Sequence, residues 1–295
     1  MPTANCLTSD GLTLHTEHAL PEGDPKAVVL LVHGYGEHSG RYAHVIDRLV
    51  RGGYAVYTLD HRGHGKSEGV RAYCDYMEQF VDDLKLYFDP ITAAYPNQKH
   101  FVVGHSMGAL ISLAFTQRYQ SQIDALVISG APVIPDADVS RALVLLGSIL
   151  TRITPKLHLL SDGGKGLLSS DPQIDIAWDN DPLTNKKPMR VRLGVEINKM
   201  ARDVRAHLAD LRLPILILHG AEDKRVNPSG SQLAYDRVSS ADKTLKLYPA
   251  MRHEIMNEIG KEGVLDEIVA WLDRHALAEA RTVGSGLRGQ VNGAN

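Results

Sequence analysis

The sequence predicts an α/β protein whose central sheet is mostly parallel and is covered by helices on both faces. Short apolar runs alternate with segments of helical periodicity along the 295 residues, which is typical of a doubly wound sheet. A Gly-x-Ser-x-Gly sequence, Gly104–Gly108, stands between an apolar run and a helical segment. One interval between strands is far longer than an ordinary connection and therefore indicates an insertion.

Seven segments are predicted to be strands, because they have strand length and are bounded by turn residues. The first, Leu12–His18, alternates in polarity and is expected at an antiparallel edge of the sheet. The others are Ala27–Val32, Tyr54–Leu59, Phe101–Val103, Ala125–Ser129, Leu213–His219 and Leu245–Tyr248. Helical spacing of apolar residues predicts helices at Tyr42–Val50, Ala109–Tyr119 and Lys261–Ala278.

The long interval lies between Ser129 and Leu213. We expect it to contain a helical cap at residues 135–206, inserted between core segments 1–134 and 207–280, with a disordered tail at 281–295. The apolar stretch Ala142–Leu150 in the cap is too short to span a bilayer. Burial within the cap, contact with a membrane surface and lining of an acyl tunnel all remain open for this stretch.

The composition excludes several classes of protein. An apolar fraction of 43% and a charged fraction of 23% are ordinary for a globular domain. The formal net charge is -3 without a basic stripe, so a nucleic-acid partner is not expected. Cys6 and Cys74 provide no disulfide framework. Because Met1–His15 has no signal-peptide pattern, we expect a cytoplasmic protein. The sequence does not indicate an oligomeric state.

Gly104–Gly108 has the arrangement of a nucleophile elbow, the tight turn that exposes a reactive serine. Ser106 is also a favourable residue for a helix N-cap, which is the alternative explanation. A reactive serine of this kind needs an acid and then a histidine, each on a loop after a strand. Asp223 and His253 occupy such loops. Glu222 is the rival acid, but the shorter carboxylate of Asp223 better fixes one imidazole tautomer.

Four segments together resemble one known family. They are His33–Tyr42 (HGYGEHSGRY), Asp60–Ser67 (DHRGHGKS), Gly104–Gly108 (GHSMG) and Asp181–Leu183 (DPL). In this combination they are similar to the monoacylglycerol lipase and lysophospholipase branch of the α/β-hydrolases. The resemblance extends from about Leu12 to about Trp271. It implies an α/β-hydrolase fold with a helical cap, a small lipid ester as substrate and no cofactor.

The resemblance also assigns roles around the serine. It implies that the backbone N–H groups of Tyr35 and Met107 form the oxyanion hole, although the family has a small residue where Tyr35 stands. It further implies that Glu37, Arg41 and His105 organise the polar end of the site, where glycerol binds. The alternative is structural: Glu37 and Arg41 brace the oxyanion loop, and His105 packs under the elbow.

Trp178 is the residue of the cap that aligns with a family tyrosine near the glycerol end. An indole N–H donates a hydrogen bond but cannot accept one, so we expect Trp178 to replace only part of that recognition. A metal site at the turn Asp60–Gly65 is not expected. Its two histidines have ligand spacing, but no second cluster supports them, and in the resembled family this turn is structural. We expect Asp60 and Arg62 to hold a loop beside the site.

These residues indicate a serine ester hydrolase. Ser106 attacks the ester carbonyl, His253 accepts and returns the proton, and Asp223 orients the histidine. The resemblance implies monoacylglycerols as substrates, and peripheral membrane contact through the cap is one option. A lysophospholipase or a short- to medium-chain carboxylesterase is the alternative, since it shares every catalytic residue. A peptidase is less favoured because the cap has no evident acidic pair, and a non-catalytic binding protein does not need an intact triad.

Overall fold

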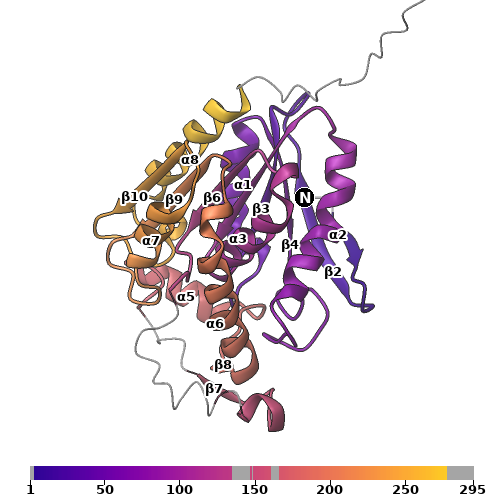
Figure 1. The fold of residues 1–295 in the computed structure, drawn as a ribbon, viewed down its shortest axis with the longest axis vertical. Helices are drawn as coiled ribbons and strands as arrows, with labels where there is room; N and C mark the ends of the chain where they lie inside the picture. The colour runs from indigo at the N-terminus through magenta and orange to yellow at the C-terminus, as the bar shows by residue number, and fades with distance from the viewer. Residues whose placement is uncertain (1–2, 135–146, 148, 161–165, 278–295) are drawn as a thin grey trace, which may run out of the picture.

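The computed structural model describes residues 3–134, 147, 149–160 and 166–277. Its centre is an eight-stranded sheet that runs through the molecule (Figure 1). In spatial order the strands are β1 (Thr3–Leu7), β2 (Thr13–Ala19), β4 (Tyr54–Leu59), β3 (Ala27–Val32), β5 (Lys99–His105), β6 (Ala125–Ser129), β9 (Ile215–Gly220) and β10 (Lys243–Tyr248). Strand β2 is antiparallel to both of its neighbours, and the remaining pairs are parallel. The predicted mostly parallel sheet is confirmed.

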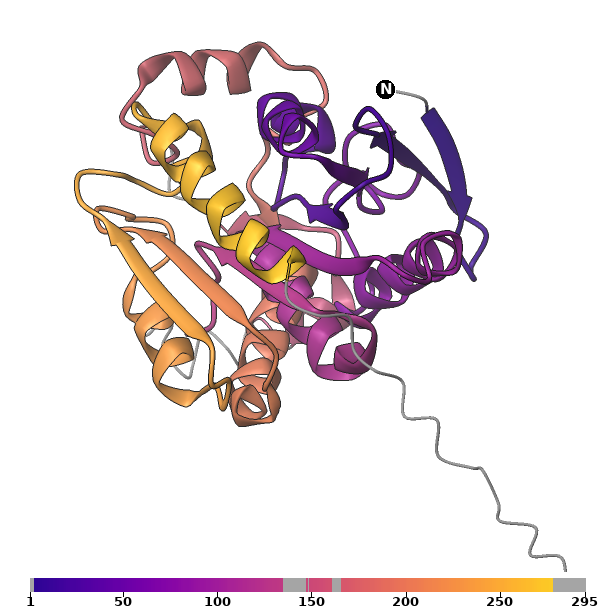
Figure 2. The same ribbon diagram turned by 90° about the horizontal axis from the view of Figure 1, so that it is seen from above.

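Helices cover both faces of the sheet, as Figure 2 shows from above. On one face lie α1 (Ala43–Arg51) and α8 (Lys261–Ala276), which pack against Val29 and Leu31 of β3. On the other face, α2 (Glu78–Ala94), α3 (Met107–Tyr119) and α7 (Ser229–Arg237) pack around Leu30 and Val32. Because successive side chains of a strand point to opposite faces, the unbroken apolar run of β3 serves both layers. Short 3-10 helices lie at Ser39–Tyr42, Gln120–Gln122, Leu208–Asp210 and Ile255–Asn257.

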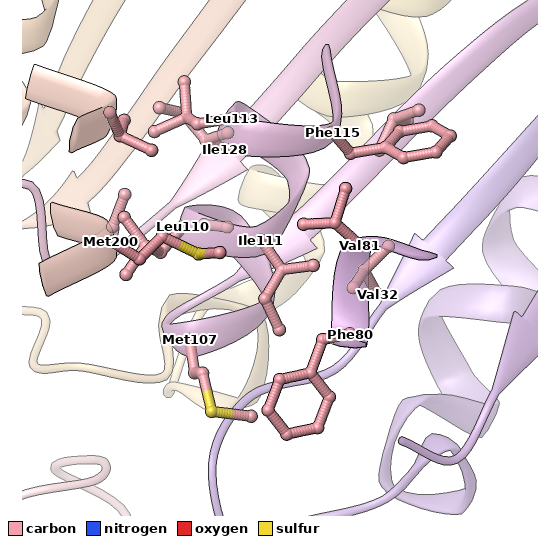
Figure 3. Close-up of a cluster of buried hydrophobic side chains, with 14 of the residues drawn as sticks. Val32, Phe80, Val81, Met107, Leu110, Ile111, Leu113, Phe115, Ile128 and Met200 are labelled. Carbon is pink, nitrogen blue, oxygen red and sulfur yellow. The ribbon is translucent and has the colours of Figure 1, made fainter. Parts of the chain in front are cut away.

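Helix α3 follows the serine motif and is almost wholly buried. Met107, Leu110 and Ile111 point into a cluster that Phe80 of α2 and Met200 of α6 (Val191–Ala206) also enter (Figure 3). A helix that is apolar on all sides is typical of a protein centre. The start of α3, and with it the serine, is therefore fixed by packing on several sides.

The predicted insertion lies between β6 and β9. Its described elements are helical residues 149–153, a two-stranded antiparallel pair of β7 (His158–Leu160) and β8 (Met189–Arg190), α5 (Pro172–Asn180) and α6. The second half of α6 packs against the same apolar cluster as α3. In the described part of the chain, no helix is long and apolar enough to cross a bilayer. The predicted helix Ala142–Leu150 lies mostly, and the predicted tail 281–295 wholly, outside the described residues.

Candidate active site

Ser106 lies in a strained turn between β5 and α3. Its backbone has φ 53 and ψ -122, a conformation that is costly for any residue except glycine and that occurs mainly at functional sites. A Cβ atom at Gly104 would lie 2.4 Å from Ser112 Oγ, and one at Gly108 would lie 2.3 Å from the carbonyl oxygen of Val32. Both glycines of the motif are therefore required by close packing around the turn.

The structure brings Ser106, His253 and Asp223 together from three different loops. Ser106 Oγ lies 2.8 Å from His253 Nε2, and His253 Nδ1 lies 2.7 Å from Asp223 Oδ2. The serine hydroxyl thus donates to the imidazole, and the opposite N–H of the ring donates to the carboxylate. Asp223 is buried, whereas the rival acid Glu222 is exposed. The backbone N–H of Glu222 donates to Met251 O at 2.9 Å.

Asp223 is ionised despite its burial. Burial alone raises the pKa of a carboxyl, but the neighbouring His253 and hydrogen bonds from His219, His253 and Val226 lower the pKa of Asp223 well below its ordinary value. The backbone N–H groups of Arg225 and Val226 lie 2.8 and 3.0 Å from Asp223 Oδ1. A charged acceptor is therefore available next to His253 throughout the neutral pH range.

The loop at residues 33–42, which we call the oxyanion loop, lies directly against the serine turn. A Cβ atom at Gly34 would be 3.1 Å from Ser106 Cβ, so the backbone of the next residue, Tyr35, lies close to the nucleophile position. Met107 is the first residue of α3, where N–H groups have no acceptor within the helix. The Tyr35 ring is buried, and its hydroxyl accepts a hydrogen bond from Asn185 Nδ2 at 2.7 Å.

Glu37 and Arg41 belong to a buried ion-pair group that also contains Glu254. Arg41 Nη1 lies 2.7 Å from Glu37 Oε2 and 2.8 Å from Glu254 Oε1, while Nη2 lies 2.7 Å from Glu254 Oε2. The other oxygen of Glu37 accepts from Gly34 N–H and from the Tyr42 hydroxyl, each at 2.6 Å. Both oxygens of Glu37, which is only 2% exposed, are thus bound to the protein itself.

This group carries two carboxylates and one guanidinium. Burial opposes ionisation of Glu254, but the charge of Arg41 and its hydrogen bonds lower the pKa of Glu254 to about 2. Glu254 was not predicted from the sequence. Its signal was weak, because an acid next to a histidine on a loop is most often a solvated charge, and its partner Arg41 is distant along the chain.

His105 packs beneath the triad. Its ring centroid lies 4.9 Å from that of His253, and its Nδ1 lies 3.3 Å from Ser129 Oγ. Burial, together with the nearby His253, lowers the pKa of His105 to about 4, so the ring is neutral at neutral pH. His105 thus contributes packing and one hydrogen bond to the floor of the site.

Trp178 of α5 covers the same end of the site. The Arg41 guanidinium lies 4.8 Å from the Trp178 ring centroid, a cation–π distance, and a Cβ atom at Gly36 would contact the indole at 3.4 Å. A cavity of about 20 Å³ lies beside the serine, and its wall is formed by Tyr35, Glu37, His105, Ser106, Leu168, Trp178, Arg225, His253 and Glu254. Of these, Leu168 and Trp178 come from the insertion.

Among the described residues, the contacts between the insertion and the oxyanion loop include three hydrogen bonds. His38 Nε2 lies 2.7 Å from Asp181 Oδ2, and Asn185 N–H donates to Gly36 O at 2.7 Å. The third is the hydrogen bond from Asn185 to the Tyr35 hydroxyl. The Asp-Pro-Leu segment of the sequence therefore begins a turn that holds the oxyanion loop.

The turn after β4 is held in place by hydrogen bonds and ion pairs of its own side chains. Asp60 accepts hydrogen bonds from Ser39 N–H, the Ser39 hydroxyl and Lys66 N–H at 2.7 to 2.8 Å. Arg62 pairs with Asp83 and Asp10, each at 2.7 Å. Among the residues that the structure describes, no three His, Cys, Asp or Glu side chains are grouped to bind a metal ion. The turn thus supports the oxyanion loop through Ser39.

The chain is similar to known proteins over most of its length. The family model of the serine aminopeptidases S33 matches residues 23–260. The chain is 35% identical to a monoacylglycerol lipase of Mycolicibacterium smegmatis, over 86% of this chain and 91% of that protein. It is 30% identical to the human monoglyceride lipase, over 91% of this chain and 89% of that protein.

A solved structure, the monoacylglycerol lipase of Paleococcus ferrophilus, superposes with a TM-score of 0.79 and 30% identity, and the match covers 89% of this chain and 99% of that one. This match confirms the predicted fold, and the extent of the sequence matches confirms the predicted family. The chain belongs to the α/β-hydrolase family, in the branch that contains the monoacylglycerol lipases.

Proposed function

We propose that this protein is a serine hydrolase that cleaves monoacylglycerols to fatty acid and glycerol. The observation that carries the proposal is the continuous hydrogen-bonded series of Ser106, His253 and Asp223 at a strained elbow. The substrate class is supported by the printed names of the relatives that this chain matches over most of their length. No cofactor is required for this chemistry.

The reaction proceeds in two halves. Ser106 Oγ attacks the ester carbonyl while His253 Nε2 takes the serine proton, and Asp223 stabilises the imidazolium that forms. His253 then gives the proton to the leaving glycerol oxygen, which leaves an acyl-enzyme. A water molecule, deprotonated by the same nitrogen, attacks the acyl carbonyl and releases the fatty acid. In both halves the backbone N–H groups of Tyr35 and Met107 bind the oxyanion.

The polar end of the cavity receives the glycerol. Glu37 and Arg41 act there mainly as braces, because their polar groups bind each other, Glu254 and the oxyanion loop. Glu37, Glu254 and Trp178 line this end of the cavity, and we assign the contact with the glycerol hydroxyls to the Trp178 N–H. His105 forms the floor.

Residues 135–206 form a cap over the serine in this proposal. Support comes from Leu168 and Trp178, which lie in this segment and line the cavity. A cavity of about 20 Å³ holds about one water molecule. An acyl chain therefore binds only after the walls of the cavity move apart, and the cap supplies the movable wall.

An aminopeptidase activity is less well supported, although the family model carries that description. Recognition of a substrate amine needs carboxylates that are not already committed to another cation. The two acids at the cavity, Glu37 and Glu254, both pair with Arg41. This pairing favours a neutral, hydroxyl-bearing head group over an amine.

The test compares four substrates with the purified protein: 1-monooleoylglycerol, oleoyl lysophosphatidylcholine, p-nitrophenyl oleate and alanyl-naphthylamide. We expect monooleoylglycerol to give oleate and glycerol in equal amounts, and Ser106→Ala to give neither. A higher kcat/KM with lysophosphatidylcholine would identify a lysophospholipase instead. Hydrolysis of the naphthylamide alone would overturn the ester assignment.

We also propose that the cap contacts membrane surfaces. In the described part of the insertion, five large apolar side chains are exposed: Ile149, Ile153, Leu157, Leu159 and Ile176. Exposed apolar groups of this kind favour insertion into a lipid interface. Flotation with phosphatidylcholine vesicles tests this. Ile153→Asp with Leu159→Asp should weaken binding, while Leu20→Asp with Leu277→Asp, two exposed leucines outside the insertion, should not. If both double variants bind the vesicles equally well, the cap is not the part of the protein that contacts the membrane.

A further inference from the structure

His219 is a fully buried histidine in contact with the acid of the proposed triad. It lies at the end of β9, four residues before Asp223, and its side chain is 0% exposed. His219 Nε2 lies 3.0 Å from Asp223 Oδ2 and 3.1 Å from Val226 O, and Nδ1 lies 2.7 Å from Ser231 Oγ in α7. The resemblance to a hydrolase family assigned this residue no role.

The partners of His219 determine where its proton resides. Both neighbours of Nε2 are acceptors, a carboxylate oxygen and a carbonyl oxygen, so Nε2 must carry a hydrogen in either charge state. In the neutral ring Nδ1 is then an acceptor, and the Ser231 hydroxyl donates to it. Ser231 is buried as well. The contacts thus fix one tautomer, with the Nε2–H directed at Asp223.

His219 and His253 share one carboxylate oxygen. Asp223 Oδ2 accepts from His253 Nδ1 at 2.7 Å and from His219 Nε2 at 3.0 Å, while Oδ1 accepts two backbone N–H groups. A second donor on Oδ2 draws electron density away from the hydrogen bond to His253. It also prevents the carboxylate from rotating, because both oxygens are held from two sides.

We propose that His219 is a positioning residue for the hydrolytic reaction: its Nε2–H fixes the orientation of Asp223 and moderates how strongly Asp223 attracts a proton to His253. This inference rests on the proposed function, since it concerns the same triad. His253 must be neutral to accept the serine proton. Without the His219 donor, Asp223 stabilises the imidazolium more strongly, so hydrolysis needs a higher pH.

The test is the pH dependence of kcat/KM for p-nitrophenyl ester hydrolysis. Methionine has a similar volume to histidine but no donor. In His219→Met, the acid limb of the profile, where kcat/KM falls at low pH, should therefore shift to higher pH by about one unit. His219→Gln, whose side-chain amide can donate toward Asp223, should return the limb to the wild-type position. His100→Met is the matched control, because His100 is also a buried histidine but lies at the start of β5. It should leave the profile unchanged.

The other titratable or charged groups at the cavity of His253 are His105, Arg225 and the Glu37–Arg41–Glu254 group. These groups are present in every variant, so their effect on the pH dependence of kcat/KM is the same in each. An acid limb in His219→Met that coincides with that of wild type would overturn the proposal. Wild-type protein and Ser106→Ala are run in parallel, so a failure of the proposed function appears separately as wild type without activity.

A measurement on the wild-type protein covers the case in which His219→Met does not fold. Imidazole nitrogens labelled with ¹⁵N report which ring nitrogen carries the proton, and the His219 signals are those absent from His219→Gln. We expect a protonated Nε2. A deprotonated Nε2 on His219 would exclude the donor and refute the proposal.

Discussion

Glu254, the residue directly after His253, holds Arg41 through two parallel hydrogen bonds of 2.8 and 2.7 Å. Arg41 belongs to the oxyanion loop, and Glu254 belongs to the loop that carries the proposed base. A bidentate pair of this kind fixes both orientation and distance. The position of the histidine relative to the oxyanion loop is thus set by a contact outside the triad.

Glu254→Gln should lower the free energy of unfolding at pH 7 by about 3 kcal/mol, because it leaves Arg41 buried with one partner fewer. Despite burial, the charge of Arg41 lowers the pKa of Glu254 from its ordinary value of about 4.5 to about 2 in the folded protein. The stabilisation by Glu254 is therefore present above about 4.5 and is lost as the pH falls toward 2. Urea unfolding at pH 7 and pH 3 measures this.

The difference between Glu254→Gln and wild type should be smaller at pH 3 than at pH 7. The exposed Glu262 in α8 provides a control, and Glu262→Gln should change stability little at either pH. A Glu254→Gln difference that is the same at both pH values would contradict the pairing.

Ser106→Ala should reduce kcat about 10⁴-fold or more, since the nucleophile is removed. Ser106→Gly should be equally inactive. It should nevertheless be about 1 kcal/mol more stable than the alanine variant, because glycine adopts φ 53 and ψ -122 without the strain that a Cβ atom imposes. Thermal unfolding of the two inactive variants compares their stabilities. An alanine variant as stable as the glycine variant would show that the elbow is not strained.

Asp223→Asn should lose about 10³- to 10⁴-fold in kcat, because an amide favours the wrong tautomer of His253 and cannot balance the imidazolium charge. Glu222→Gln should remain within about twofold of wild type, since Glu222 is exposed and its side chain lies outside the triad. Steady-state kinetics with one ester substrate measure the loss in kcat of each variant. A larger loss in Glu222→Gln than in Asp223→Asn would assign the acid role to Glu222.

Trp178→Phe should lower kcat/KM for monooleoylglycerol about tenfold relative to p-nitrophenyl oleate. Phenylalanine keeps an aromatic ring over Arg41 but lacks the indole N–H proposed to meet the glycerol. The ratio of the two kcat/KM values is the readout. If both substrates lose activity equally, Trp178 acts by packing against Arg41 and Gly36 alone.

Most strands could be predicted because burial on both faces leaves an unbroken apolar run, as in Ala27–Val32, where prediction and structure coincide. Strand β1 was missed, because Thr3–Leu7 is short and contains no Val, Ile or aromatic residue. It forms the outer edge, and the predicted Leu12–His18 segment lies beside it as the second antiparallel strand. Helix α2 was also missed, although its buried residues Phe80, Val81, Leu84, Phe88 and Ile91 keep helical spacing on both sides of Pro90.

The residues of the site also fall into two groups, those that the sequence predicts and those that it does not. Ser106 and the loops of Asp223 and His253 follow from local rules about strand ends, so the sequence alone brings them into one hypothesis. Glu254 and His219 depend on which segments pack together. Neither the ion pair of Glu254 with Arg41 nor the hydrogen bond of His219 to Asp223 leaves a periodic signal in the chain.

The contacts of Asp181 and Asn185 with the oxyanion loop limit how this enzyme can be re-engineered. A chimera that receives the cap of a relative keeps its triad but loses the partners of His38, Gly36 and Tyr35. Its turnover then falls for reasons unrelated to the shape of the new acyl pocket. Substrate range can be transplanted only when the loop and the turn beginning at Asp181 are exchanged as one unit, and evolution of the two segments is constrained in the same way.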